Sequence, residues 1–500
     1  MVRWWWLLLG GSVCAWAQNA AMVRAAANLF AAQNSSAAHT EEQRNEAAKL
    51  RHQAEQDEQA GRYGEALRNY AHATAIVRNA QWTPAAELAA SVELRVAHVL
   101  IEPGQPVTLS LARLYPVVPS EGAKLTASVF LAPATTQAQA TRELMPPVAI
   151  EPGRIPFSAQ VQIPEMTPGN YDLAVHLTPA GAGVPDMLGD VFTKIVPVHI
   201  ERLAGEAAAL RGRLANASAK NAAERFPSGA LATVEYALRF YERADRGGEG
   251  LRRFGRYSFR EEFTRANAIL DDLEEGRDPF AGRPGDFHRA YRSAVDQTLQ
   301  PYRLFVPLAY DGATPAPLVI ALHGSGGDEN DFFDGYGDLP LKPEAERLGF
   351  LVVCPKGRAS NSGYRGAAER DVFDALAEVR REYRIDARRI YLMGHSMGAF
   401  ATWRLAAERP ELFAALGLIS GGGDPGEANK IRNIPQYVVH GELDHVVPVA
   451  RSRAMVEALR KAGATVVYVE LPGAGHYETV AAQLRPMLDF FAGHARPAPR

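Results

Sequence analysis

The chain has 500 residues, of which 47% are hydrophobic and 22% are charged, and its formal net charge at pH 7 is −3. One hydrophobic core does not organise a chain of this length, so we expect several domains. The nearly balanced charge argues against nucleic acid or an anionic membrane surface as the main partner.

The first residues have the pattern of a secretory signal peptide. Arg3 supplies a positive charge, the apolar run 4–9 comes next, and Ala15-Trp16-Ala17 has the small residues of a cleavage site. The apolar run is shorter than the roughly 20 residues that a membrane span requires. We therefore expect residues 1–17 to be removed, the mature protein to be secreted or periplasmic, and no stable insertion into a membrane.

The chain contains two cysteines, Cys14 and Cys354. Val13 stands before Cys14, where a lipoprotein site would have a small residue, so a lipid anchor is not favoured. Removal of residues 1–17 leaves Cys354 alone, and no disulfide within the chain is then expected. Cys354 ends an apolar run and is interpreted as an inert core thiol.

Residues 18–94 are rich in Ala, Glu, Gln and Arg and are predicted to be helical. Within them, segment 54–76 resembles one tetratricopeptide-like helical hairpin, through Gly61, Tyr63, Ala66, Leu67, Tyr70 and Ala73. One repeat cannot bury the core of a solenoid. The hairpin is therefore expected to pack locally or to dock a protein partner.

Residues 95–202 consist of short alternating apolar segments separated by Pro and Gly turns. Strands are predicted at 107–111, 125–130, 158–163 and 171–177. This spacing is typical of a small antiparallel β-sandwich. No cluster of candidate ligands stands out here, and we interpret the region as an accessory domain.

Residues 203–285 return to helical periodicity, with Leu231, Val234, Leu238 and Tyr241 along one face. Such a stripe is usually core, so we interpret the region as a helical connector. Its last part, 279–285, is rich in Pro and Gly and predicts a linker.

Residues 286–500 alternate apolar strands with amphipathic helices. Strands are predicted at 302–308, 318–323, 350–354, 390–393, 415–419, 436–440 and 465–470, and helices at 341–348, 370–383, 399–408 and 451–462. Nearly continuous apolar strands between helices indicate a mostly parallel sheet with helices on both faces.

The pentapeptide Gly394-His395-Ser396-Met397-Gly398 lies between a predicted strand and a predicted helix. A G-x-S-x-G sequence in that context is typical of a nucleophile elbow, whose glycines permit the sharp turn that exposes the serine hydroxyl. Ser396 is therefore the candidate nucleophile. His395 is expected to be packed or hydrogen-bonded rather than catalytic.

A serine nucleophile needs a base within reach, and the base needs an acid that fixes its tautomer. In elbow proteins the chain order is Ser, acid, His. Asp444 comes after strand 436–440, and His476 lies on the glycine-rich loop after strand 465–470. Both are at carboxyl ends of strands, where open α/β sheets place their sites. Asp444 and His476 are the candidate acid and base.

Backbone amides must also stabilise the oxyanion. Strand 318–323 runs into the glycine-rich turn His323-Gly324-Ser325-Gly326-Gly327. We predict the Ser325 amide as one donor, with Gly326 as the alternative, and the amide of Met397 as the other donor. An ordinary glycine-rich turn is the competing interpretation.

Other residues compete for the acid and for a metal site. Asp424 is an alternative acid, although Pro425-Gly426 favours a turn there, and Glu442 is expected to be a supporting or surface residue. A metal cluster of Asp444 with His323, His440, His445 and His476 lacks a short-spaced ligand pattern. No metal and no organic cofactor are therefore expected.

Residues 302–491 resemble the catalytic domain of the α/β-hydrolase superfamily. The run 389–413 looks most like secreted esterases and predicted peptidases related to the prolyl-oligopeptidase and polyhydroxybutyrate-depolymerase groups. Segment 440–448 resembles their acid-bearing motif, and Gly475-His476 resembles their histidine loop. Ala399 departs from the pattern, since many relatives have glycine there. Some of these esterases carry an immunoglobulin-like domain ahead of the hydrolase, which would suit the β-rich region.

Together these observations predict a secreted serine hydrolase that cleaves small or polymeric carboxylic esters through an acyl-enzyme on Ser396, with Asp444 and His476. A serine peptidase with the same triad is the nearest alternative, and the absence of a long β-propeller repeat favours the esterase. A binding or scaffold protein with an inactive hydrolase fold is the third interpretation. Loss of a triad residue would favour it, and none is lost.

Overall fold

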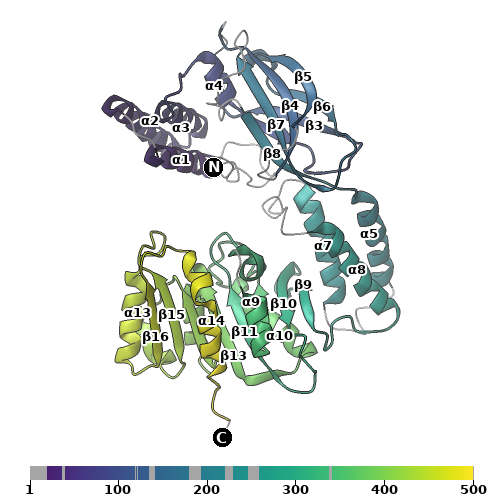
Figure 1. Cartoon of the computed structure of the whole chain (residues 1–500), viewed down its shortest axis with the longest axis vertical. Helices are drawn as coiled ribbons and strands as arrows, with labels where there is room; N and C mark the ends of the chain where they lie inside the picture. Colours follow the sequence, from purple (N-terminus) through teal and green to yellow (C-terminus); the bar gives the residue numbers. More distant parts are fainter. Residues whose placement is uncertain are drawn as a thin grey trace. The chain divides into compact units, whose positions relative to one another are not determined.

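The computed structural model describes residues 20–36, 40–118, 120, 122–134, 141–179, 193–219, 229–245, 258–336 and 340–498. The chain divides into two compact units, Met1–Ala208 with Arg239–Arg260 and Ala209–Leu238 with Glu261–Arg500 (Figure 1). The predicted signal peptide, 1–17, lies outside the described residues. Within the described ranges, no helix is both long enough and apolar enough to span a bilayer.

The first unit begins with four helices: α1 (Ala20–Ser36), α2 (Glu41–Gln59), α3 (Tyr63–Val77) and α4 (Pro84–Ala90). A capping box starts α2, because the Thr40 hydroxyl accepts from the Gln43 amide and the Gln43 side chain accepts from the Thr40 amide. Ala54 of α2 and Ala66 of α3 share one core with Tyr70. The helix pair contains the hairpin-like segment that the sequence indicates.

Two sheets come next in the first unit. The first has the order β1-β3-β6 and consists of β1 (Val92–Val96), β3 (Pro106–Arg113) and β6 (Phe157–Gln162). The second has the order β2-β8-β7-β4-β5 and consists of β2 (Leu100–Ile101), β8 (Thr193–Ile200), β7 (Gly169–Pro179), β4 (Leu125–Pro133) and β5 (Arg142–Ile150). A 3-10 turn, η1 (Pro152–Arg154), precedes β6. Alternate residues of β4 are buried, and residues of both sheets, including Leu109 and Leu173, form one core.

The described residues of the connecting segment form three helices: α5 (Ala204–Ala219), α7 (Ala230–Asp245) and α8 (Phe259–Glu274). The Arg213 guanidinium of α5 donates to the Asn267 side chain at 2.8 Å and to Asp271 at 2.7 Å, both on α8. Val234 and Leu238 are buried, as expected for a core stripe.

The second unit is built on an eight-stranded sheet with the order β16-β15-β14-β13-β11-β12-β10-β9. The strands are β9 (Gly285–Arg292), β10 (Leu299–Val306), β11 (Ala316–Leu322), β12 (Leu351–Pro355), β13 (Ile385–His395), β14 (Ala415–Ile419), β15 (Gln436–Gly441) and β16 (Val466–Leu471). Strands β11 to β16 are parallel to one another, whereas β10 is antiparallel to both β12 and β9. All parallel strands therefore end at the same edge.

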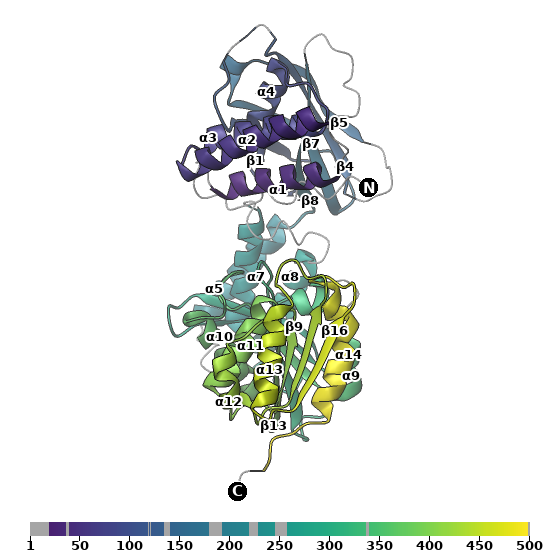
Figure 2. The same cartoon turned by 90° about the vertical axis from the view of Figure 1, so that its left-hand side faces the viewer.

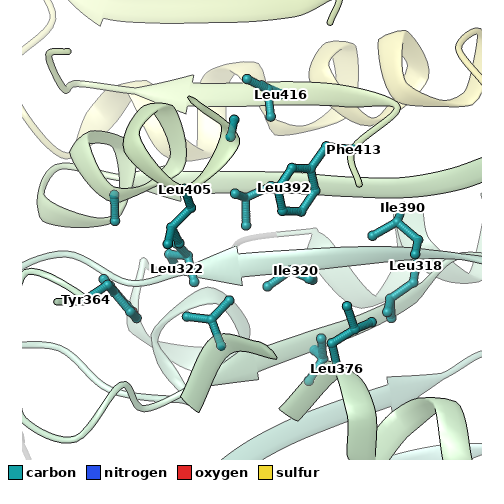
Figure 3. Packing of buried hydrophobic residues seen from close by; sticks show 14 of the residues in the cluster. Leu318, Ile320, Leu322, Tyr364, Leu376, Ile390, Leu392, Leu405, Phe413 and Leu416 are labelled. Carbon is teal, nitrogen blue, oxygen red and sulfur yellow. The ribbon is translucent and has the colours of Figure 1, made fainter. Parts of the chain in front are cut away.

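Helices cover both faces of this sheet (Figure 2). One face carries α9 (Leu341–Leu348) and α14 (Glu478–Ala492), and the other carries α10 (Ala367–Glu382), α11 (Met397–Glu408), α12 (Ala428–Ile431) and α13 (Ala450–Lys461). Short turns η3 (Asp331–Gly335) and η4 (Pro425–Glu427) lie in loops. Figure 3 shows part of the core beneath α10 and α11, including Leu318, Ile320, Leu322, Leu376, Leu392, Leu405 and Leu416.

The structure differs from the sequence-based expectation at 279–285. This stretch does not behave as a free linker, because Phe280 is buried with the Arg289 guanidinium 3.7 Å from its ring centroid. The Tyr383 hydroxyl also donates to Phe280 O at 3.0 Å. Gly285 then starts β9, which the sequence pattern did not predict, since Asp286, Arg289 and Arg292 interrupt its apolar residues.

Candidate active site

Strand β13 ends at His395 and helix α11 begins at Met397, so Ser396 makes the turn between them. Its backbone has φ 52° and ψ −117°, a conformation that costs roughly 1–3 kcal/mol for a residue with a side chain. The Ser396 amide donates to Ile419 O of β14 at 2.8 Å. This bond continues the sheet ladder and holds the turn, so the pentapeptide has the sharp geometry of an elbow.

Both glycines of the pentapeptide are required by close packing. A Cβ on Gly398 would lie 2.0 Å from Leu322 O at the end of β11, and a Cβ on Gly394 would lie 2.3 Å from the carbonyl carbon of Gly398. Backbone atoms cannot rotate out of such contacts. The glycines therefore allow α11 to start directly against the end of β11.

The structure brings the predicted acid and base together. His476 Nδ1 lies 2.7 Å from Asp444 Oδ2, and Asp444 Oδ1 accepts from the amides of Val446 at 2.9 Å and Val447 at 2.8 Å. Burial opposes the charged form of Asp444, but these hydrogen bonds outweigh it and lower the pKa of the carboxyl. The carboxylate therefore accepts the Nδ1 proton, and neutral His476 keeps its lone pair on Nε2, the nitrogen that can take a proton.

The loop that carries the acid and the loop that carries the histidine are joined to each other. The Leu443 amide donates to Ala474 O at 2.9 Å. The Glu442 carboxylate accepts from the Gly473 amide at 3.0 Å. Glu442 thus supports the contact between the two loops, in line with its interpretation as a supporting residue.

His395 ties the histidine loop to the elbow, a role that spacing in the sequence does not indicate. Its Nε2 donates to His476 O at 3.0 Å, and its Nδ1 accepts from the Tyr336 hydroxyl at 3.0 Å. The Tyr336 oxygen in turn accepts from the Gly324 amide at 3.3 Å. Burial and the neighbouring His476 lower the pKa of His395 to about 4, so the ring is neutral and its two bonds have the donor and acceptor that they require. The only signal for this role in the sequence is that His395 precedes Ser396.

The turn after β11 lies beside the nucleophile. A Cβ on Gly324 would be 3.4 Å from Ser396 Cβ. The Gly326 amide, the alternative oxyanion donor, already donates to Ser360 O at 2.8 Å. Within the described part of the chain, the amides of Ser325 and Met397 have no acceptor. The geometry therefore favours Ser325 over Gly326.

Two further candidate residues, Asp424 and Cys354, have the surroundings of structural residues. The Asp424 carboxylate accepts from the Gly426 amide at 2.9 Å and caps the turn η4, as a turn residue would. Cys354 is a free, buried cysteine in β12, and burial raises the pKa of its thiol, which makes it unreactive.

Comparison with known proteins agrees with the fold of this unit. A model of the dienelactone hydrolase family matches residues 358–481, which include Ser396, Asp444 and His476. A probable feruloyl esterase C of Aspergillus flavus is 29% identical over 203 residues, covering 39% of this chain and 72% of that protein. Cutinase 2 of Thermobifida cellulosilytica is 38% identical over 143 residues, covering 26% of this chain and 50% of that protein.

The chain belongs to the α/β-hydrolase superfamily. Curated relatives are matched over 20% to 72% of their own lengths. The solved structure of a thermostable esterase is 18% identical, with a TM-score of 0.39, and the match covers 81% of this chain and 100% of that chain.

Ala399 is the residue at which the sequence departs from the pattern that it resembles, and the structure of this α/β-hydrolase shows what accommodates it. A Cβ on Gly421, in the turn after β14, would lie 2.4 Å from Ala399 Cβ. The methyl group of Ala399 therefore occupies space that Gly421 leaves open.

Proposed function

We propose that the protein is a serine esterase in which Ser396 is the nucleophile, His476 the base and Asp444 the acid. One observation carries the proposal. A strained serine stands at the start of α11, on the sheet edge where a histidine has its Nδ1 bound to a buried carboxylate at 2.7 Å. This combination serves acyl transfer.

In the proposed reaction, Ser396 Oγ attacks the ester carbonyl carbon while His476 Nε2 takes the hydroxyl proton. The amides of Ser325 and Met397 stabilise the oxyanion. His476 then gives the proton to the leaving alcohol, and water releases the acyl group by the same steps. The Ser396–His476 hydrogen bond is not formed in the structure, and such bonds often tighten only when substrate is present.

The comparisons support an ester rather than a peptide as substrate. The relatives described above are named as an esterase and a cutinase, and nothing in those names favours a peptide. An ester is also easier to cleave than a peptide, because an alkoxide is a better leaving group than the anion of an amine.

The surroundings of the triad support a substrate with a bulky apolar group. Among the described residues, eight large hydrophobic side chains are exposed, and four of these lie on the segments that carry the triad: Phe400, Leu443, Val446 and Tyr477. Residue Tyr477 is 61% exposed, and its ring packs edge-on against the His476 ring, with the ring centroids 5.1 Å apart. We infer that this surface contacts an aromatic or long-chain part of the ester.

We also infer that the protein is exported and that the first unit is accessory to catalysis. The signal-peptide pattern of residues 1–17 supports export. The shared core of the two sheets supports a β-sandwich domain. The helical hairpin is proposed to dock a protein partner.

A fluorophosphonate probe tests the nucleophile. The wild-type protein and Ser420→Ala should be labelled, whereas Ser396→Ala should not. Ser420 is a matched control, since it also stands after a strand with positive φ. Labelling that persists in Ser396→Ala would refute the assignment.

The substrate class is tested with nitrophenyl esters and aminoacyl anilides. We expect hydrolysis of the esters, with lower KM for aromatic acyl groups than for acetate. Tyr477→Ala should raise KM for the aromatic esters while Tyr477→Phe leaves it unchanged. Hydrolysis of the anilides alone would overturn the esterase proposal.

A further inference from the structure

His440 is a wholly buried histidine that the proposed mechanism does not use. It is the residue before the last of β15, and its side chain has no exposed surface. Its Nε2 lies 3.2 Å from Asp444 Oδ2 and 2.9 Å from Val447 O. Its Nδ1 lies 2.7 Å from Ser452 Oγ.

Hydrogen-bond chemistry decides which nitrogen of His440 carries the proton. A carbonyl oxygen and a carboxylate only accept, so Nε2 carries the proton. It donates to Val447 O at 2.9 Å, and Asp444 Oδ2 lies 3.2 Å from the same nitrogen. Burial lowers the pKa of His440, which leaves the ring neutral and makes Nδ1 an acceptor. The Ser452 hydroxyl has one proton, and two acceptors lie within reach of it, Nδ1 at 2.7 Å and Gly421 O at 2.9 Å. It supports this tautomer when it donates to Nδ1.

The Asp444 carboxylate thus faces four donors. Oδ1 accepts from two backbone amides, those of Val446 and Val447. Oδ2 faces two imidazoles, His476 at 2.7 Å and His440 at 3.2 Å. The oxygen that holds the proposed base is therefore shared with a second histidine on the neighbouring strand.

We propose that His440 is a positioning residue, whose Nε2–H orients Asp444 so that Oδ2 meets His476. The inference rests on the proposed function of the triad. A second donor on Oδ2 also draws negative charge away from the bond to His476. Loss of that donor would strengthen the attraction between Asp444 and the His476 imidazolium, and so make His476 more basic.

A merely structural role for His440, closing the turn at Val447, would have a different signature. Such a role would change the fraction of folded protein but not the pH at which His476 titrates. The titratable groups that face His440 are Asp444 and His476, and Glu470 on β16 also interacts with it. His395 stands next to them. All four groups are unchanged in the variants of His440 and Ser452 that test the role.

The experiment measures the rate of fluorophosphonate labelling, with kcat and KM for nitrophenyl acetate, between about pH 5 and about pH 9. His440→Leu should lower the labelling rate and kcat about tenfold and leave KM unchanged. In this variant the acid limb, the fall of both rates on the low-pH side of the profile, should move to higher pH. His440→Gln places an amide donor near the same oxygen, and should restore both rates to within about threefold with the wild-type acid limb. His494→Leu, a partly buried histidine on the opposite edge of the sheet, is the matched control and should behave as wild type.

Equal losses in His440→Leu and His440→Gln with an unchanged acid limb would overturn the inference. If His440→Leu does not fold, Ser452→Ala decides, with an expected loss of about threefold and the same upward shift of the acid limb. An unchanged acid limb in that variant would also overturn it. Failure of the wild-type protein to react with the probe would instead refute the proposed function on which the inference rests.

Discussion

Strands β13 and β14 are neighbours and end in the same way. Ser396 comes directly after β13 with φ 52°, and Ser420 comes directly after β14 with φ 50°. Each serine amide donates to a carbonyl of the next strand, Ser396 to Ile419 at 2.8 Å and Ser420 to Val439 at 2.9 Å. Both are strained serines at the same sheet edge, yet only one has the surroundings of a nucleophile.

The two turns differ in the segment that comes after the serine and in the contacts of its hydroxyl. Helix α11 begins directly after Ser396, so the unsatisfied amides of its first turn stand at the serine. Ser420 is succeeded by three glycines, and its buried hydroxyl bonds to Thr479 Oγ1 at 2.8 Å. Ser420 therefore shares the backbone strain of Ser396, but it lacks the helix start and the unengaged hydroxyl that support Ser396 as the proposed nucleophile.

Both turns are linked to the same backbone atom, His476 O, the first through His395 and the second through Thr479, which is bonded to Ser420. His476 O accepts from His395 Nε2 at 3.0 Å and from Thr479 Oγ1 at 3.2 Å. The turn after β13 supplies the proposed nucleophile, and the turn after β14 helps to hold the loop of the proposed base. Under the proposed function, the first strand end carries the chemistry and the second supports it.

Replacing each serine by alanine should give the largest contrast. Ser396→Ala should lower kcat by about 10⁵-fold because the nucleophile is lost. Ser420→Ala should lower it by about threefold or less, through a looser histidine loop. Steady-state hydrolysis of nitrophenyl acetate measures both, and similar losses would erase the distinction between the two turns.

The two aspartates that come after β15 and β14 provide the next test. Asp444→Asn should lower kcat by about 10⁴-fold, because the amide no longer holds the tautomer of His476. Asp424→Asn should leave kcat unchanged, since its side chain serves only its own turn. A large loss in the second variant would move the acid to the strand end that we consider structural.

Alanine substitutions of the glycines at the two turns should differ in whether a second substitution can restore the lost stability. Gly398→Ala should destabilise the fold by about 3 kcal/mol, because the new Cβ meets the backbone oxygen of Leu322. Gly421→Ala should cost about 2 kcal/mol, since the severe contact of its Cβ is with the side chain of Ala399, at 2.4 Å, and the backbone atoms near it lie at 3.4 Å. The double variant with Ala399→Gly should recover that loss. Urea unfolding measures all three, and an unrecovered double variant would contradict the packing described.

The smallest effect concerns pH and His395. Its pKa is about 4 in the folded protein, below the ordinary value, so only the unfolded chain binds this proton between about pH 4 and about pH 6.5. The stability that it contributes is present above about pH 6.5 and is lost as the pH falls toward 4. Between about pH 7 and about pH 5 the loss should be roughly 2 kcal/mol.

His395→Gln should remove that part of the pH dependence while keeping groups that can bond to Tyr336 and to His476 O. Urea midpoints at the two pH values, for this variant and the wild-type protein, provide the measurement. An equally steep fall in the variant would show that another group is responsible.

Much of the second unit could be predicted because its signals are local. Helix 341–348 was predicted with the bounds of α9, and the predicted strands all lie within or overlap strands of the sheet. Strand β9 was not predicted, because an edge strand interrupted by charged residues lacks the continuous apolar run of a buried one. The stretch 279–285 was predicted as a linker because composition does not reveal that Arg289 and Tyr383 hold Phe280 in place.

The amino-acid order alone determined the elbow pentapeptide around Ser396 and the succession of Asp444 and His476, because strand-end positions and chain order can be counted along the sequence. Only the tertiary structure favours Ser325 over Gly326 as the proposed oxyanion donor, because the Gly326 amide donates to Ser360 O. It also brought His395, Tyr336 and His440 onto the triad loops. Most of these contacts join segments that are far apart in the chain. Residue spacing cannot predict such bonds, because they form only when the strands lie side by side.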